Sequence, residues 1–156
     1  AAQWLHLAGM ALAPRLAAVR RFAADPHFGV REFAWMAVRD AVVADTDAAV
    51  LALVPWTADA DENIRRFASE LTRPRGVWCA PIPVLQREPW RALPLLEPLR
   101  ADSSRYVQNS VANWLNDASK GHGPWVQTLG TRWLAESDAP ATRYIVKRAL
   151  RTLSKP

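Results

Sequence analysis

Ile64-Arg65-Arg66-Phe67-Ala68 is the stretch of sequence that decides the fold, because its pattern recurs along the chain. Val30-Arg31-Glu32-Phe33-Ala34 has the same pattern, Val107-Gln108-Asn109-Ser110-Val111 repeats it, and Thr142-Arg143-Tyr144-Ile145-Val146 matches it more loosely. The four stretches begin at positions 30, 64, 107 and 142, so they are 34, 43 and 35 residues apart. Paired helices that recur at roughly 35–47 residues are typical of HEAT and armadillo arrays. The recurrence therefore predicts a HEAT-like (armadillo-type) α-solenoid, and the alternative is a helical bundle with accidental similarity between its helices.

Apolar residues at helical spacing run through the rest of the chain, and no useful stretch alternates with the period of two that a strand needs. The expected fold is therefore all-α, with stacked antiparallel helix pairs. We expect a single HEAT-like repeat domain, 1–156, with repeats at roughly 13–43, 46–73, 88–119 and 124–153. Because the chain opens without Met inside an apolar helical pattern, we also expect its N-terminal part to be truncated.

Several helix limits follow from individual residues. We expect one helix from Val30 to Val43, and the acidic cluster 59–62 suits the N-terminus of the helix that holds Ile64. Thr46 or Asp47 can cap the helix before it, and the segment 102–104 can cap the helix that holds Val107. The sequence Gly121-His122-Gly123-Pro124 should break that last helix. A long irregular segment, 73–89, precedes a short helix over 90–99, and loops of this length tend to be functional.

The charge of the chain favours an anionic partner. Its 20 basic residues, 17 of them Arg, face 15 acidic residues, which gives a net charge of +5. The segment 139–155 holds five basic residues and no acidic one, and it is either a solvated basic helix or a phosphate-binding surface. Basic residues also lie near the starts of the helices expected to line the concave face of the solenoid, namely Arg31, Arg65, Arg66, Arg105 and Arg143.

Other function classes are excluded by what the chain contains. One cysteine, Cys79, cannot form an intramolecular disulfide or a cysteine-based zinc cluster, and the three histidines lack metal-ligand spacing. We therefore expect no metal and no cofactor. No apolar run approaches the roughly 20 residues that a membrane span needs, so we expect no membrane partner and a cytoplasmic location.

Two longer motifs go beyond architecture. The segment 63–75 (Asn63-Ile64-Arg65-Arg66-Phe67-Ala68-Ser69-Glu70-Leu71-Thr72-Arg73-Pro74-Arg75), followed by Trp78, and the segment 110–120 (Ser110-Val111-Ala112-Asn113-Trp114-Leu115-Asn116-Asp117-Ala118-Ser119-Lys120) resemble signatures of the DNA alkylation repair enzymes with HEAT-like repeats. A weaker third match is 29–32, and the resemblance covers about 27–153, nearer the AlkC side of this AlkC/AlkD superfamily. Trp114 stands where the family pattern has His, and Gly76-Val77 replaces a Leu-Pro-like pair. Family members are also usually longer at the N-terminus, and we expect no appended C-terminal domain here.

The resemblance implies a monofunctional DNA glycosylase, a hydrolase that excises cationic alkylated bases such as 3-methyladenine from double-stranded DNA. It implies a monomer that works at the nucleoid in DNA repair. An alkylated base is already a cation and a good leaving group, so carboxylates and aromatic faces suit the remaining task of stabilising positive charge. By position, the resemblance gives Asp117 as the carboxylate that faces the sugar and the attacking water, Glu70 and Glu32 as further carboxylates, and Trp78 as the aromatic wall.

The residues themselves leave alternatives open. Glu32, Glu70 and Asp117 lie on successive inner helices and can converge, but Glu70 also lies four residues after Arg66 and can form a plain surface ion pair. The residues expected to contact DNA are Arg65, Arg66, Arg73, Arg75, Arg105, Lys120, Arg143, Lys147, Arg148 and Arg151. Lys120 can also be read as an amine nucleophile. The alternative to a glycosylase is a non-catalytic HEAT-repeat module that binds a nucleic-acid backbone or a protein partner, or an inactive fragment of the fold.

Overall fold

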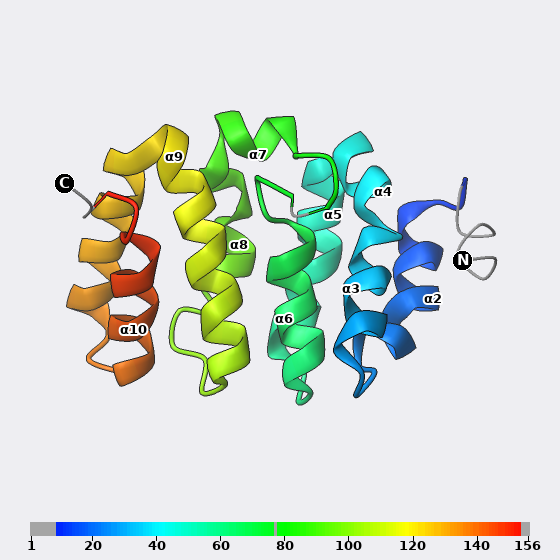
Figure 1. The fold of residues 1–156 in the computed structure, drawn as a ribbon, viewed down its shortest axis with the longest axis horizontal. Helices are drawn as coiled ribbons and strands as arrows, with labels where there is room; N and C mark the ends of the chain where they lie inside the picture. Colours follow the sequence, from blue (N-terminus) through cyan, green and yellow to red (C-terminus); the bar gives the residue numbers. More distant parts are fainter. Residues whose placement is uncertain (1–8, 77, 154–156) are drawn as a thin grey trace.

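The computed structural model describes residues 9–76 and 78–153, and within them every regular element is a helix (Figure 1). In chain order the elements are α2 (Leu12–Ala23), α3 (Phe28–Met36), α4 (Arg39–Ala44), α5 (Thr46–Leu53), η1 (Val54–Ala58), α6 (Glu62–Leu71), α7 (Pro83–Arg87), η2 (Pro89–Ala92), α8 (Leu93–Leu96), α9 (Arg105–Glu136) and α10 (Pro140–Ala149), of which η1 and η2 are 3-10 helices. The predicted all-α fold of stacked helices is confirmed. None of the helices in the described residues is long and apolar enough to cross a membrane.

The helices form two layers, and one of them carries all four recurring stretches. In this layer α3, α6, the first half of α9 and α10 pack side by side, at the front of Figure 1. Behind them lie α5, α8 and the second half of α9, while α2 packs against α3 at the N-terminal end. The four recurring stretches therefore lie on the helices of a single layer, as the sequence predicted. The limits of the four repeats stay a prediction.

A contact across α6 shows how the front layer is shaped. Arg31 of α3 and Tyr106 of α9 meet although α6 lies between their helices, and the Nε atom of Arg31 donates to the Tyr106 hydroxyl at 3.2 Å. Arg66 of α6 stacks on the same ring, 4.3 Å from its centroid. These contacts bridge three helices on the side of the layer that faces away from α5 and α8, and we call this side the inner face.

The core follows from the apolar faces of these helices. In α6, Ile64, Phe67 and Leu71 are buried at the spacing of one helix face. Trp35, Trp56, Trp114 and Trp133, which stand at apolar positions in the sequence, are likewise buried. Because a buried large apolar side chain contributes about 1.5–3 kcal/mol relative to an exposed one, this packing holds the two layers together.

Helix ends agree only in part with the limits expected from the sequence. Asp61 caps α6 by accepting from the amide of Asn63, and Ser104 caps α9 by accepting from the amide of Val107, as the acidic and Asp-Ser-Ser clusters indicated. The expected cap of α5 at Thr46 or Asp47 is wrong, because Asp45 accepts from the amide of Ala48.

Three helix predictions need correction. The single helix expected over 30–43 is split into α3 and α4 at 37–38. The irregular segment ends at 82, and the chain from 83 to 96 is a series of short helices, α7, η2 and α8, because each proline lacks an amide donor and suits a first turn. The break expected at 121–124 is a kink inside α9, where His122 alone leaves helical geometry at φ −133° and ψ 49° ahead of Pro124.

Candidate active site

The three carboxylates that the sequence suggested for catalysis lie in one chain of alternating charges on the inner face. Arg66 Nη2 lies 3.0 Å from Glu32 Oε1 and 3.7 Å from Glu70 Oε2. Arg73 joins the next pair, with Nη1 2.9 Å from Glu70 Oε1 and Nη2 2.9 Å from Asp117 Oδ2. We call these five residues from α3, α6, α9 and the segment after α6 the carboxylate network. The structure therefore brings Glu32, Glu70 and Asp117 together through two arginines.

Glu70 is the buried centre of the carboxylate network. Its side chain is 6% exposed, and its Oε2 atom accepts a hydrogen bond of 2.7 Å from the Ser110 hydroxyl. Burial alone would raise the pKa of Glu70, but Arg66, Arg73 and Ser110 outweigh it, so the pKa lies below its ordinary value. Both oxygens of Glu70 are thus engaged, and the residue is suited to orienting its neighbours.

Asp117 lies at the far end of the carboxylate network and has one oxygen less engaged. Burial raises the pKa of Asp117 above its ordinary value, and Arg73 offsets only part of that effect. Both Nε and Nη2 of Arg73 approach Oδ2, whereas Oδ1 has the ammonium of Lys120 at 3.8 Å. The Asp117 side chain is 7% exposed, nearly as buried as Glu70, and among the described residues Oδ1 is the oxygen of the carboxylate network with the weakest polar contacts.

Glu32 is the most exposed of the three acids, at 32% of its side chain. While Oε1 pairs with Arg66, Oε2 accepts from the indole of Trp35 at 3.0 Å. The indole fixes the rotamer of Glu32, so the carboxylate stays at the edge of the carboxylate network.

Trp78 lies on the loop that leaves the carboxylate network at Arg73. This side chain is 89% exposed, unlike the four buried tryptophans of the core, and its φ of 62° is the only positive φ of a non-glycine residue in the described chain. The loop is closed at its base by a hydrogen bond of 3.1 Å from the Ile82 amide to the Pro74 carbonyl. An exposed aromatic residue held in a rarely populated conformation is typical of functional sites.

The basic residues expected to contact DNA divide into two groups. Arg65 uses its guanidinium within the fold, because it donates to Asp102 at 2.7 and 3.0 Å and to the carbonyls of Asp59 and Ala60. Arg66 and Arg73 belong to the carboxylate network. The other seven lie at or near the surface, namely Arg75, Arg105, Lys120, Arg143, Lys147, Arg148 and Arg151.

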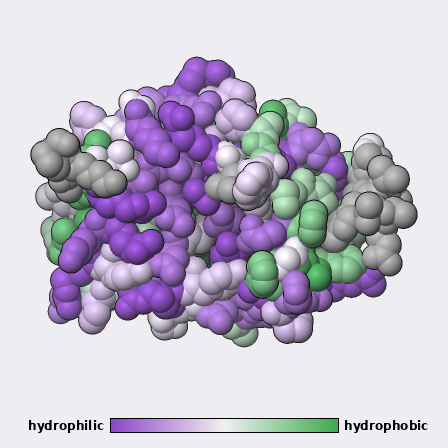
Figure 2. All heavy atoms as spheres, in the orientation of Figure 1, coloured by the Kyte–Doolittle hydropathy of each residue, from purple (hydrophilic) through white to green (hydrophobic). Residues whose placement is uncertain are grey.

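Most of this second group borders the C-terminal half of the inner face, where Figure 2 shows hydrophilic residues gathered over α9 and α10. Arg105 and Arg148 stack on the same ring of Tyr144, 3.5 and 5.6 Å from its centroid. Arg151 donates to Asn113 at 2.9 Å. This half of the inner face is therefore a cationic surface with side chains already arranged.

Sequence reasoning missed Ser110 and Arg39, and also the tyrosines that order the surface arginines. Apart from Arg39 and Asp40, the stretch 34–43 is apolar, which is a signal that could have marked Arg39 as buried and paired. Ser110 was part of the recurring stretch, but only the structure shows that it bonds Glu70 and Ser69, at 2.7 and 2.8 Å.

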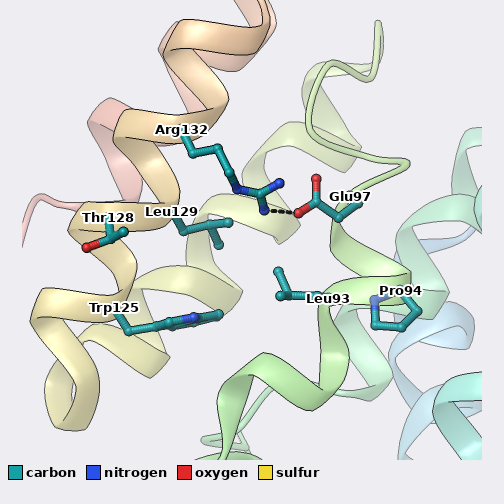
Figure 3. A pocket seen from close by; sticks show the side chains of 7 residues that line it. All are labelled: Leu93, Pro94, Glu97, Trp125, Thr128, Leu129 and Arg132. Atoms are coloured by element: carbon teal, nitrogen blue, oxygen red, sulfur yellow. Dashed lines mark hydrogen bonds and ion pairs between the residues drawn. The ribbon is translucent and has the colours of Figure 1, made fainter.

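A hollow of about 640 Å³ lies elsewhere, between α8 and the second half of α9 (Figure 3). Its wall is mostly apolar, and its two charged side chains, Glu97 and Arg132, are paired with each other. Because the hollow belongs to the layer behind the inner face and its charges are already neutralised, it is not the candidate site.

No protein-family model matches this chain. The uncharacterized protein YhaZ of Bacillus subtilis (strain 168) is 41% identical over 119 residues, which are 76% of this chain and 33% of the relative. The solved structure of Pseudomonas fluorescens alkylpurine DNA glycosylase AlkC, bound to DNA containing an abasic site analog, is similar with a TM-score of 0.72 and 39% identity. It covers 77% of this chain and 33% of that protein. The chain thus spans about a third of the length of these relatives, and over that part its fold and sequence are similar to those of AlkC.

Proposed function

We propose that this chain forms the catalytic part of a monofunctional DNA glycosylase, which hydrolyses the N-glycosidic bond of cationic alkylated bases such as 3-methyladenine in double-stranded DNA. The observation that carries the proposal is the clustering of carboxylates in the carboxylate network. Three of them lie together in a chain that carries +5, and they are paired with Arg66, Arg73 and the exposed ammonium of Lys120. A site that only binds phosphates gains nothing from three clustered carboxylates, whereas a site that meets a cation does.

The reaction that fits this network needs no strong acid. An alkylated base leaves as a neutral molecule with the electron pair of its glycosidic bond, and positive charge develops on the sugar. The oxygen of a water molecule then bonds to the anomeric carbon. Asp117, as an anion, stabilises the oxocarbenium-like sugar through Oδ1 and accepts the proton that the water gives up.

The other predicted site residues take supporting roles in this proposal. Glu70 has both oxygens engaged and holds Arg73 in place, so that Arg73 fixes the orientation of Asp117. Glu32 adds negative charge near the base. Trp78 offers an exposed indole, and Trp is the side chain with the strongest attraction for a cation over its face.

DNA binding in this proposal rests on the seven surface cations and not on the full set expected from the sequence. Arg65, Arg66 and Arg73 are held by carboxylates of the chain itself, so they are left out. The alkylpurine glycosylase AlkC was solved bound to DNA containing an abasic site analog, which supports DNA as a partner for this chain. Backbone contacts of this kind fix the register of the protein on DNA without reading its sequence.

A non-catalytic DNA-binding module is the second candidate, because the cationic surface on α9 and α10 can bind phosphates without the carboxylate network. One experiment separates the two. Methylated duplex DNA is incubated with the chain, and free methylated bases are measured by chromatography, with Asp117→Asn as the matched variant. Release that depends on Asp117 supports the glycosylase. Tight DNA binding with no release by either protein contradicts it and supports the module.

A further inference from the structure

Arg39 is a buried cation that binds main chain where a carboxylate would be the usual partner. It begins α4, its exposure is 3%, and its hydrogen bonds within the described residues go to three main-chain carbonyls. Nη1 donates to Leu71 at 2.6 Å, Nη2 to Arg73 at 2.6 Å, and Nε to Ala80 at 3.1 Å. A buried arginine is normally paired with a carboxylate. This one instead holds segments of main chain in place.

The three carbonyls that accept hydrogen bonds from Arg39 belong to two segments, one that enters the Trp78 loop and one that leaves it. Leu71 is the last residue of α6, where carbonyls lack helical partners and carry the negative end of the helix dipole, and Arg73 follows at the start of the loop. Ala80 lies on the returning arm of the Trp78 loop. The guanidinium therefore ties both arms of this loop to α4, next to the hydrogen bond between Ile82 and Pro74.

The tip of the loop is tight enough to need such a support. A Cβ atom on Gly76 would lie 2.2 Å from Cys79 Sγ and 2.5 Å from the Cys79 carbonyl oxygen, so only glycine fits there. Trp78, which lies between Gly76 and Cys79, has a positive φ of 62°. A conformation of this kind persists only where the surroundings fix it. Since the indole of Trp78 is 89% exposed, that support has to come through the main chain of the loop.

We propose that Arg39 is a positioning residue, which holds the loop from Arg73 to Ile82 so that Trp78 is presented beside the carboxylate network. The catalytic half of this inference rests on the proposed function. Arg39 acts through Trp78 and touches no substrate. The competing explanation is that its positive charge acts directly on Glu70 and Asp117, both of which interact with it electrostatically.

The position of the loop can be measured without any activity. Trypsin cleaves after Arg75, which is exposed on this loop, but not at the Arg73-Pro74 bond. In Arg39→Met we expect cleavage at Arg75 about tenfold faster than in the parent protein under native conditions, because the loop opens locally. Arg65→Met is the matched control. Arg65 also donates to two main-chain carbonyls, but at the opposite end of α6, so its replacement should change cleavage at Arg75 by less than about twofold.

A double-mutant cycle on base release decides between the two explanations. Arg39→Met and Trp78→Ala should each lower the rate of base release by about tenfold. When Trp78 is already replaced by Ala, adding Arg39→Met should lower the rate by less than about a further twofold. Arg39→Lys, which keeps the charge and part of the donors, should restore part of the loop protection and of the rate. A full tenfold loss in both backgrounds would overturn the proposal in favour of direct electrostatics, and so would unchanged cleavage at Arg75 in Arg39→Met. If the parent protein releases no base, the proposed function fails, and the cleavage comparison alone decides whether Arg39 holds the loop.

Discussion

Arg73 binds Asp117 through a single carboxylate oxygen: its Nε and Nη2 atoms both lie 2.9 Å from Oδ2. The same guanidinium donates from Nη1 to Glu70 at 2.9 Å. One planar group therefore fixes two carboxylates from different helices and leaves Oδ1 of Asp117 beside Lys120. The geometry of the candidate site depends on Arg73 more than on any direct contact between the acids.

Asp117→Asn should abolish most base release while leaving the fold intact. The change keeps the size of the side chain and removes the charge that would stabilise the sugar cation. Removing one such interaction typically costs about 3–4 kcal/mol, or on the order of 10²–10³ in rate. DNA binding, measured by fluorescence anisotropy, should be unchanged or slightly tighter because a negative charge has gone. A rate within twofold of the parent protein would remove Asp117 from the mechanism and point to Glu70.

Trp78→Ala should lower base release without lowering stability. The indole is exposed, so its removal costs no core packing, and thermal unfolding should be unchanged. A cation–π contact of about 1–2 kcal/mol predicts a rate roughly 5- to 30-fold lower. Trp78→Phe keeps an aromatic face and should retain an intermediate rate. Equal rates for all three proteins would exclude an aromatic wall at this position.

Because the pKa values of Asp117 and Glu70 are shifted in opposite directions, we expect activity and stability to respond differently as the pH falls. The pKa of Asp117 is raised by burial, so the anion needed for catalysis is lost as pH falls through a value above the ordinary 3.8. The pKa of Glu70 is lowered by its arginines, so the stability it contributes is present above its ordinary value of 4.5 and is lost only as pH falls through the lower folded value.

Base release should therefore decline on acidification while the near-UV circular dichroism signal is still native. The rate of uncatalysed release is subtracted at each pH. Glu70→Gln serves as the comparison, because it should lower stability at neutral pH and remove the part of the acid transition that belongs to Glu70. A loss of activity that coincides with the loss of the dichroism signal would argue against a raised pKa for Asp117.

Replacing Arg148 and Arg151 together by Ala should weaken binding to duplex DNA equally for all sequences. Both lie at the cationic end of the inner face, and the slope of log K against log salt should fall by about 1 for each phosphate that the variant no longer neutralises. Arg132→Ala is the matched control, because Arg132 belongs to the other layer and pairs with Glu97. Binding that does not depend on salt would favour a protein partner for this surface.

The fold could be read from the sequence because local patterns specify it. The apolar face of α6 and its Asp61 cap are both contained within about ten residues, and the same pattern recurs in α3 and α9. Trp78 could be separated from the core tryptophans because prolines surround it. What failed was the continuity of the helix over 30–43, the extent of the irregular segment 73–89 and the cap of α5.

The roles of individual arginines could not be read in the same way. Arg65 pairs with Asp102, 37 residues away, and Arg39 bonds carbonyls 32, 34 and 41 residues away. A main-chain carbonyl leaves no mark in a sequence, and an arginine that satisfies one looks identical to an arginine that awaits a phosphate. Ser110 was missed for the same reason, since its partner Glu70 is 40 residues distant.

The stack of Arg105 and Arg148 on Tyr144 has a consequence for the speed of recognition. The hydroxyl of Tyr144 is itself anchored to Asn109 at 2.7 Å, so the ring is fixed and limits the rotamers of both arginines. Ordering a free long side chain during association costs about 0.5–1.5 kcal/mol of conformational entropy. Here much of that ordering is complete before any anion arrives. Encounters at this end of the molecule should therefore be limited by diffusion and orientation, and not by the search of flexible side chains for a partner.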